Sequence, residues 1–253
     1  MSSSSKKNST TLLAANDKST LHQNLEFTAI EQYKLLRTNL NFTLPQGEKC
    51  PVIGITSAMR GEGKSTTAIN LSYVLAEKGS NVLLIDGDLR MPSVAKKMKI
   101  NNDRGLTDLL MGSDARMSDF RSELLSNWYV VPSGDIPPNP SELLGSKRMQ
   151  LILNELKQSF DYIIIDLPPV NLVSDALSIS EMLSGMVVVI REDYSEKKDI
   201  ADCFRQLSFS DVNVLGCVIN SSKSGSGTYN KYKKSRSYKK YVYYRTSSKD
   251  DTE

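Results

Sequence analysis

The stretch from residue 52 to residue 72 constrains the fold more than any other part of this 253-residue chain. It combines a short apolar strand (VIGIT), a glycine-containing turn (SAMRGEGKS) and a segment with helical spacing. Gly61 and Gly63 allow backbone N–H groups to converge on one anion, which the N-terminus of the helix also faces. Lys64 can reach the β- and γ-phosphates of a nucleotide, and the Ser65 hydroxyl can ligate magnesium. The stretch therefore predicts a phosphate-binding loop.

The loop departs from the strict pattern at its first glycine, which is Ala58 in this chain. The alternative interpretation is an ordinary strand-to-helix turn that binds nothing. The strand before the loop and the helix after it favour the phosphate-binding interpretation. The predicted nucleotide-binding residues of the loop are Gly61, Glu62, Gly63, Lys64, Ser65 and Thr66.

Carboxylates follow two further apolar strands. The strand in NVLLIDGDLRMP runs into Asp86 and Asp88, and the strand in DYIIIDLPPV ends in Asp166 and two prolines. Ligands of open α/β sheets bind at the carboxyl ends of the strands, and side chains two residues apart in an extended segment project the same way. The second of these strands has the form of a Walker B element, whose acid holds magnesium directly or through water. Turns that simply end a strand are the alternative, but three acids beside a phosphate loop coincide by chance far less often than one.

Strands and helices alternate along the rest of the chain. Strands are predicted in NWYVVPSG, MVVVIR and VNVLGCVIN, and helices at residues 146–159, about 175–183 and about 196–207. The segment IPPNPSELLGS is predicted to be a rigid proline-rich connection. This alternation predicts an α/β fold of the P-loop NTPase class, with a mainly parallel sheet covered by helices on both faces.

An amphipathic helix is predicted from residue 26 to residue 44, before Pro45. Its apolar positions are Phe27, Ile30, Leu35, Leu36 and Leu40. Three charged residues spaced by three lie along one edge of this helix: Glu31, Lys34 and Arg37. Two interpretations of this edge stay open, a solvated charged face and a contact with another subunit.

Composition limits the class of protein. Apolar residues make up 39% of the chain, which is enough for a sizeable core. No apolar run approaches the roughly 18 residues of a membrane span, and MSSSSKKNST lacks the apolar core of a signal peptide, so a cytoplasmic location is predicted. Cys50, Cys203 and Cys217 lack metal-ligand spacing and are predicted to be free thiols. The single histidine, His22, lies in a polar stretch, so catalysis must proceed without an imidazole from the folded core.

The two ends of the chain differ in composition from its middle. Residues 1–24 are predicted to be disordered, residues 25–221 to form the folded domain, and residues 222–253 to form a flexible basic tail. Residues 223–245 contain eight Lys or Arg and no acid, together with Tyr229, Tyr232, Tyr238, Tyr241, Tyr243 and Tyr244. Three interpretations of this tail compete: it binds nucleic acid, it binds an anionic membrane surface, or it is a substrate.

Taken together, GEGKST, LLIDGDLRMP, YIIIDLPPV, the EQYKLLRTNL helix and the tyrosine cluster resemble the bacterial tyrosine kinases of polysaccharide export. The resemblance covers roughly residues 26 to 245. Within the family, the chain resembles more specifically the separate cytoplasmic kinase chain of Gram-positive members. It implies an ATP- and magnesium-dependent autokinase that phosphorylates the six tail tyrosines, mainly those of a neighbouring subunit. It further implies a role in capsular or exopolysaccharide synthesis and export.

The resemblance also implies roles for individual residues. Asp86 would be the base that accepts the tyrosine proton, and Lys64 with the loop amides would neutralise phosphate charge. Magnesium would be held by Ser65, Asp88 and Asp166. Asn220, at the end of the last strand, would contact adenine by analogy with related ATPases, with a strand-end cap as the alternative.

Partners follow from the same resemblance. They are a membrane adaptor on a separate chain that recruits the kinase to the inner face of the membrane, a homo-oligomeric ring, a phosphotyrosine phosphatase, and sugar-nucleotide enzymes as substrates, with no nucleic acid. The helix with Glu31, Lys34 and Arg37 would mediate ring assembly. Two residues depart from the family pattern: Arg60 replaces a frequent proline, and Lys34 replaces the middle arginine of Glu-x-x-Arg-x-x-Arg. A lysine cannot reproduce a bidentate arginine contact, so the strength of assembly stays an open question at this position.

The nearest alternative function is a switch ATPase of the septum-positioning or plasmid-partitioning type, which does not phosphorylate protein. Those relatives carry a second lysine at the position of Met59, and its absence and the tyrosine tail weigh against them. A non-catalytic module that binds through its tail is a third hypothesis. It predicts binding that survives Lys64→Met and weakens steeply with salt.

Overall fold

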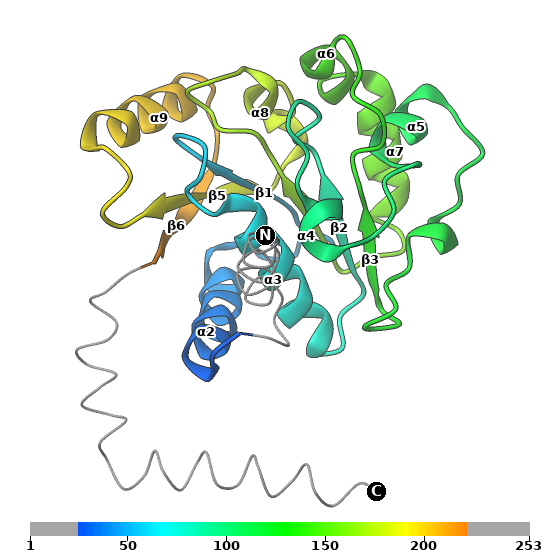
Figure 1. The fold of residues 1–253 in the computed structure, drawn as a ribbon, viewed down its shortest axis with the longest axis horizontal. Helices are drawn as coiled ribbons and strands as arrows, with labels where there is room; N and C mark the ends of the chain where they lie inside the picture. Colours follow the sequence, from blue (N-terminus) through cyan, green and yellow to red (C-terminus); the bar gives the residue numbers. More distant parts are fainter. Residues whose placement is uncertain (1–24, 222–253) are drawn as a thin grey trace, which may run out of the picture.

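The computed structural model describes residues 25–221 (Figure 1). The predictions of a disordered segment at residues 1–24 and of a flexible tail at residues 222–253, with its six tyrosines, fall outside the described residues. None of the helices within residues 25–221 is long and apolar enough to cross a membrane.

Six strands, all paired in parallel, form one sheet in the order β3-β2-β4-β1-β5-β6. The strands are β1 (Val52–Ser57), β2 (Val82–Asp86), β3 (Trp128–Val131), β4 (Tyr162–Asp166), β5 (Gly185–Arg191) and β6 (Val214–Asn220). After β1 the chain builds β2, β3 and β4 on one side of it, and then β5 and β6 on the other. The carboxyl end of β1 is therefore a topological switch point, where such sheets bind ligands. The predicted α/β fold with a parallel sheet is confirmed.

Helices cover both faces of this sheet, as predicted (Figure 1). One face carries α2 (Phe27–Thr43), α3 (Lys64–Glu77) and α4 (Val94–Met98). The other carries α5 (Leu106–Met111), α6 (Pro140–Leu144), α7 (Lys147–Leu156), α8 (Asp175–Ser178) and α9 (Lys197–Phe209), with 3₁₀ turns at Met117–Phe120 and Ser180–Met182. Successive side chains of β2 point to opposite faces, so Leu83 and Ile85 join one core and Val82 and Leu84 the other. Because helices cover both faces of the sheet, its strands are apolar on both sides.

Two segments differ from their predicted structure. The proline-rich connection contains the short helix α6, because Asn139 precedes Pro140 at the first helical position and Gly145 ends the helix. The helix expected at residues 175–183 is interrupted: α8 ends at Ser178 and a 3₁₀ turn follows. The Ser178 hydroxyl donates to the carbonyl of Ser174, and such side-chain bonds compete with a regular helix.

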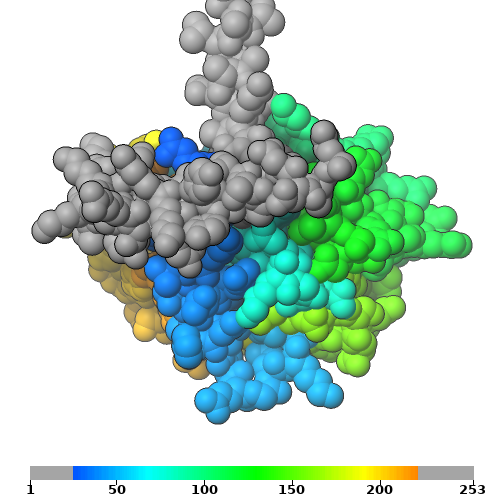
Figure 2. Space-filling view, turned by 90° about the horizontal axis from the view of Figure 1, so that it is seen from below, coloured from blue at the N-terminus to red at the C-terminus, as the bar shows by residue number. Residues whose placement is uncertain are grey.

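Helix α2 packs on α3 and β6. Its blue atoms lie on the surface in Figure 2. Ile30 and Leu40 are buried in the contact, which confirms the amphipathic prediction for these positions. Leu35 was wrongly assigned to the apolar face, since 51% of it is exposed. At about 100° per residue, Leu35 lies about 140° around the helix from Leu40.

Candidate functional site

The loop between β1 and α3 has the backbone that its glycines predict. Gly61 has φ +80° and Gly63 has φ +103°, in a region that other residues rarely adopt. A Cβ atom on Gly63 would lie 2.0 Å from Asn220 Nδ2, so this side chain occupies the space beside the glycine. Asn220 Nδ2 donates to the Glu62 carbonyl at 2.9 Å. The end of β6 is thereby fixed against the phosphate-binding loop.

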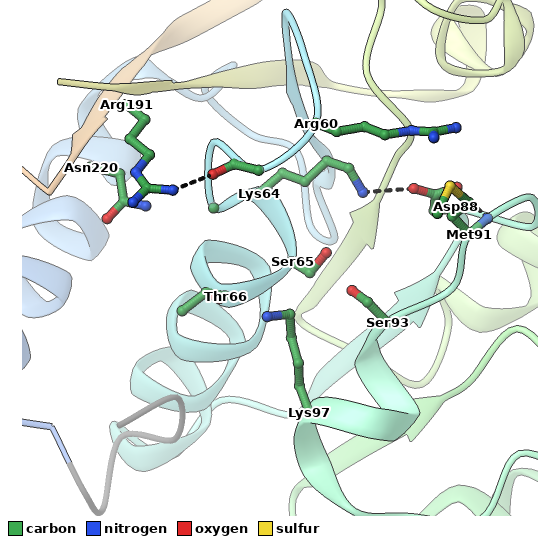
Figure 3. A pocket seen from close by; sticks show the side chains of 12 residues that line it. Arg60, Lys64, Ser65, Thr66, Asp88, Met91, Ser93, Lys97, Arg191 and Asn220 are labelled. Atoms are coloured by element: carbon green, nitrogen blue, oxygen red, sulfur yellow. Dashed lines mark hydrogen bonds and ion pairs between the residues drawn. The ribbon is translucent and has the colours of Figure 1, made fainter. Parts of the chain in front are cut away.

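A pocket of about 390 Å³ opens over this loop (Figure 3). It is lined by Arg60, Gly61, Gly63, Lys64, Ser65, Thr66, Asp88, Met91, Ser93, Lys97, Arg191 and Asn220. Seven predicted site residues are thus brought together at the carboxyl ends of the strands. Three cations in the pocket, Arg60, Lys97 and Arg191, were not among the predicted site residues. The sequence alone does not identify Lys97 as a pocket residue, because nothing in the sequence of α4 shows that this helix lies beside the loop.

The predicted acids meet beside this pocket. Asp86 and Asp166 are register partners on the adjacent strands β2 and β4. Lys64 Nζ lies 2.8 Å from Asp88 Oδ2 and 3.6 Å from Asp166 Oδ1. Lys64 therefore pairs with two acids that lie far apart in the sequence, one just after β2 and one at the end of β4.

Burial and mutual charge shift the pKa values of this cluster. Burial by itself lowers the pKa of Lys64, but Asp166 and Asp88 together raise it above its usual value. Burial raises the pKa of Asp86 to about 7, and the nearby Asp166 carboxylate contributes to the rise. Burial likewise raises the pKa of Asp166, while the Lys64 charge opposes that change. Such shifts are typical of functional sites but also occur in structural ion-pair clusters.

Asp86 also holds the start of α4. Its Oδ2 accepts hydrogen bonds from the backbone N–H groups of Ser93 (3.0 Å) and Val94 (2.9 Å). Among the described residues, its Oδ1 accepts only a longer bond, of 3.3 Å, from the Asp88 N–H. Asp86 thus positions a helix and still has one oxygen with spare acceptor capacity.

The donor set fits a magnesium ion. Both carboxylate oxygens of Asp166 are buried and accept no hydrogen bond from the described residues. Ser65 and Asp88 line the neighbouring pocket. Mg²⁺ prefers oxygen donors and binds through one or two carboxylates together with phosphate oxygens. Within residues 25–221 no set of three or more His, Cys, Asp or Glu side chains could hold a metal by itself, so phosphate or water must complete such a site.

The side chain of Glu62 supports the loop from outside the pocket. It is fully buried, its Oε2 accepts the Met59 N–H at 2.8 Å, and its Oε1 accepts the Ser195 hydroxyl. The guanidinium of Arg191, the last residue of β5, donates to the Gly61 carbonyl at 3.0 Å. The sequence did not reveal this support, because Ser195 lies more than 130 residues from Glu62. Glu62 therefore belongs to the loop as predicted, but its carboxylate stabilises the loop and does not line the pocket.

A second long-range pair, also missed from sequence, holds the segment after β2. Arg90 Nε and Nη2 contact the buried Asp175 carboxylate at 2.8 and 3.0 Å, and the Ser141 hydroxyl donates to the same carboxylate. Asp175 begins α8 and Ser141 lies in α6. The two helices thus fix the segment that carries Asp88.

The charged edge of α2 is partly used inside the chain. Lys34 Nζ forms an ion pair with Glu31 at 3.0 Å, and Arg37 Nη1 donates to the Val74 carbonyl of α3 at 2.6 Å. The arginine has further N–H donors, so this contact uses only part of its hydrogen-bonding capacity.

Comparison with known proteins identifies the family. The family model described as an AAA domain matches residues 50–210. Tyrosine-protein kinase YwqD of Bacillus subtilis (strain 168) is 39% identical over 193 residues, which cover 76% of this chain and 81% of that protein. The crystal structure of the chimerical protein CapA2B2 is 33% identical, with a TM-score of 0.70 over 75% of this chain and 83% of that chain. The septum site-determining protein MinD of Pyrococcus horikoshii OT3, complexed with Mg-ADP, is 27% identical, with a TM-score of 0.56 over 69% of this chain and 72% of that chain.

These similarities separate the fold from the function. The P-loop fold with its nucleotide-binding loop is shared with the septum-positioning ATPase. The kinases are more similar in sequence, and Met59, at the position of the second lysine of such ATPases, packs against the hydrophobic core. The chain belongs to the bacterial tyrosine-protein kinase family of capsule and exopolysaccharide biosynthesis.

Proposed function

We propose that this chain transfers the γ-phosphoryl group of ATP to the tyrosines of its own C-terminal tail, largely those of a neighbouring subunit. The observation that carries the proposal is the position of Lys64, which contacts Asp88 and Asp166 at the floor of a phosphate-binding pocket. Phosphoryl transfer depends on positioning and on charge neutralisation, and this arrangement offers both. The candidate acceptors are Tyr229, Tyr232, Tyr238, Tyr241, Tyr243 and Tyr244.

In the transfer step the phenol oxygen forms a bond to the γ-phosphorus, and the bond from that phosphorus to the β,γ-bridging oxygen breaks, which releases ADP. The phenol proton passes to the Asp86 carboxylate. A phenol has a pKa of about 10, so at neutral pH it needs an acceptor within hydrogen-bond reach. The raised pKa of Asp86, about 7, suits this role. Lys64 and the loop N–H groups stabilise the charge that develops on the phosphoryl oxygens.

We assign Ser65, Asp88 and Asp166 to Mg²⁺ and Asn220 to the adenine end of the pocket. Bound magnesium would supply positive charge next to the β- and γ-phosphates. Asp166 supports this assignment, since its two buried oxygens accept no hydrogen bond from the described residues. Asn220 supports the second assignment because it lines the pocket at the end of β6.

We further propose a membrane adaptor on a separate chain, which brings the kinase to the inner face of the membrane. The similarity to the chimerical protein CapA2B2 supports a two-chain system. Ring assembly through α2 is supported by Arg37, whose guanidinium has donors left after its bond to Val74. A phosphatase would reverse the modification, and sugar-nucleotide enzymes would be external substrates. Each phosphate adds about −1.5 to −2 charges, so phosphorylation of several tyrosines would reverse the charge of the basic tail.

Intact-mass analysis and anti-phosphotyrosine detection after addition of ATP and magnesium test the proposal. The variants are Lys64→Met, a chain truncated after Ser221, and Lys78→Met as a matched control, because Lys78 is an exposed lysine just after α3. Each is measured with and without a candidate adaptor peptide. We expect mass steps of one phosphate in wild type and in the control, and none in the other two. ATP hydrolysis without phosphotyrosine, even with the adaptor peptide, would contradict the proposal.

A further inference from the structure

The nucleotide pocket contains more cations than its loop requires. Arg60, Lys64, Lys97 and Arg191 all line it. Lys64 is paired with Asp88, and Arg191 donates to the Gly61 carbonyl. Arg60 is exposed to solvent, whereas Lys97 is half-buried, and a half-buried charge needs a specific partner more than an exposed one does.

Lys97 comes from α4 and reaches toward the first turn of α3, where Ser65 and Thr66 lie (Figure 3). Its ammonium group forms no hydrogen bond or ion pair with any residue between 25 and 221. The Lys97 ammonium faces the N-terminal end of α3, whose free N–H groups carry partial positive charge. An anion bound at this end of the pocket would be stabilised by the lysine and by the helix terminus together.

The position of Lys97 is fixed by the same acid that completes the catalytic cluster. Asp86 Oδ2 binds the N–H groups of Ser93 and Val94, which open α4, and the Lys97 N–H donates to the Ser93 carbonyl at 3.0 Å. Val94 and Met98 are buried on the sheet and hold the helix from its other side. The backbone of Lys97 therefore lies in a helical turn that is hydrogen-bonded to Asp86 at the end of β2.

We infer that Lys97 is a second phosphate-binding lysine, which contacts the phosphate oxygens of the nucleotide from α4 while Lys64 contacts them from the loop. The inference rests on the proposed function, because it assumes that the pocket holds a nucleotide. A polyphosphate on the loop would lie between the Lys97 ammonium and the N-terminal turn of α3. Hydrogen bonds between an ammonium group and a phosphate are charge-assisted and stronger than neutral ones.

A titration of fluorescent mant-ADP with magnesium tests the inference, with the full chain as wild type, Lys97→Met, Lys97→Arg and Lys96→Met. Lys96 is the matched control, because it is an exposed lysine on the same helix that does not line the pocket. We expect Lys97→Met to raise the Kd at least about tenfold, which corresponds to the loss of a hydrogen bond to a charged group. Lys97→Arg keeps most of the affinity, and Lys96→Met changes it less than about twofold. The Kd of wild type should also rise more with salt than that of Lys97→Met.

A Kd for Lys97→Met within about twofold of wild type would overturn the inference, and so would an equal loss in Lys96→Met, which would indicate a general charge effect. In either case, tail phosphorylation that depends on Lys64 would leave the proposed function standing. If wild type bound no nucleotide at all, the proposed function and the inference would both fail. The fluorescence of Trp128, the single tryptophan, checks that each variant is folded.

Discussion

The Lys64 ammonium lies 2.8 Å from the Asp88 carboxylate although both side chains are almost completely buried. Burial of two opposite charges costs desolvation energy, which is offset only where the geometry is good. Here the same ammonium also lies 3.6 Å from Asp166, so one cation serves two buried acids. The pair is therefore a sensitive point for stability as well as for the proposed chemistry.

Lys64→Met should destabilise the ligand-free protein by about 3 kcal/mol at pH 8, because two carboxylates lose their cation. The loss should be smaller at pH 5. Without Lys64 the folded-state pKa of Asp166 rises further above its unfolded value, so stability is present at low pH and is lost as pH increases. Urea unfolding followed by Trp128 fluorescence at both pH values measures this difference, with Lys78→Met as control. A loss that is equal at both pH values would contradict the prediction.

Asp86 should make the free energy of unfolding depend on pH in the absence of nucleotide and magnesium. Its folded-state pKa is raised from 3.8 to about 7, chiefly by burial, so the folded protein binds this proton more tightly than the unfolded chain. The associated stability is present below about pH 4 and is lost as pH rises through 7, to a total of about 4 kcal/mol. Asp86→Asn should flatten that part of the curve while its amide oxygen still accepts the N–H groups that open α4. A variant curve parallel to that of wild type from pH 4 to 7 would count against the raised pKa.

The parts of this site that were predictable are those in which local sequence carries the constraint. The loop glycines and the three acids follow directly from strand ends, and the parallel sheet places these ends together. The contacts Arg90–Asp175 and Glu62–Ser195 join residues that are far apart in the sequence, and nothing in either local pattern indicates the partner. Leu35 was misplaced for the opposite reason, because an apolar residue type was given more weight than its angle around the helix.

The Glu62–Ser195 contact should matter for the shape of the loop. Ser195→Ala removes the hydroxyl that donates to the fully buried Glu62 carboxylate and accepts the Arg191 N–H. We expect a stability loss of about 1 to 3 kcal/mol, because a buried charged acceptor loses a donor. Weaker mant-ADP binding should accompany it. Ser208→Ala, at an exposed position of α9, is the control and should leave both quantities unchanged.

A double-mutant cycle with Glu62→Gln separates this contact from other effects of the substitutions. The two changes should be non-additive, since each removes the same hydrogen bond. Strict additivity would mean that Ser195 acts on the loop by another route.

The three cysteines should differ in reactivity. Burial raises the pKa of Cys50 to about 11 and that of Cys203 to about 12, so neither forms much thiolate at pH 8. Burial also raises the pKa of the Cys217 thiol, but Cys217 is exposed at the edge strand β6, where the reagent can reach it. Iodoacetamide at pH 8 should therefore alkylate Cys217 first in the native protein and all three thiols in urea, as measured by peptide mass spectrometry. Modification of Cys203 before Cys217 would show that the region around α9 opens readily.

Gly63→Ala should reveal how closely the loop and β6 are joined. The substitution combines an unfavourable φ of +103° with a Cβ only 2.0 Å from Asn220 Nδ2. Gly79→Ala is the matched control, since Gly79 has φ +106° and nothing within 4 Å of its added Cβ. The control should lose about 1 to 2 kcal/mol of stability through backbone strain alone. Gly63→Ala should lose more, and it should also weaken mant-ADP binding because Asn220 must move out of its place in the pocket.

Combining Gly63→Ala with Asn220→Ser should recover part of the stability, since the shorter side chain relieves the collision but not the strain. Equal losses in the two alanine variants, with no recovery in the double variant, would show that Asn220 yields freely and does not fix the loop.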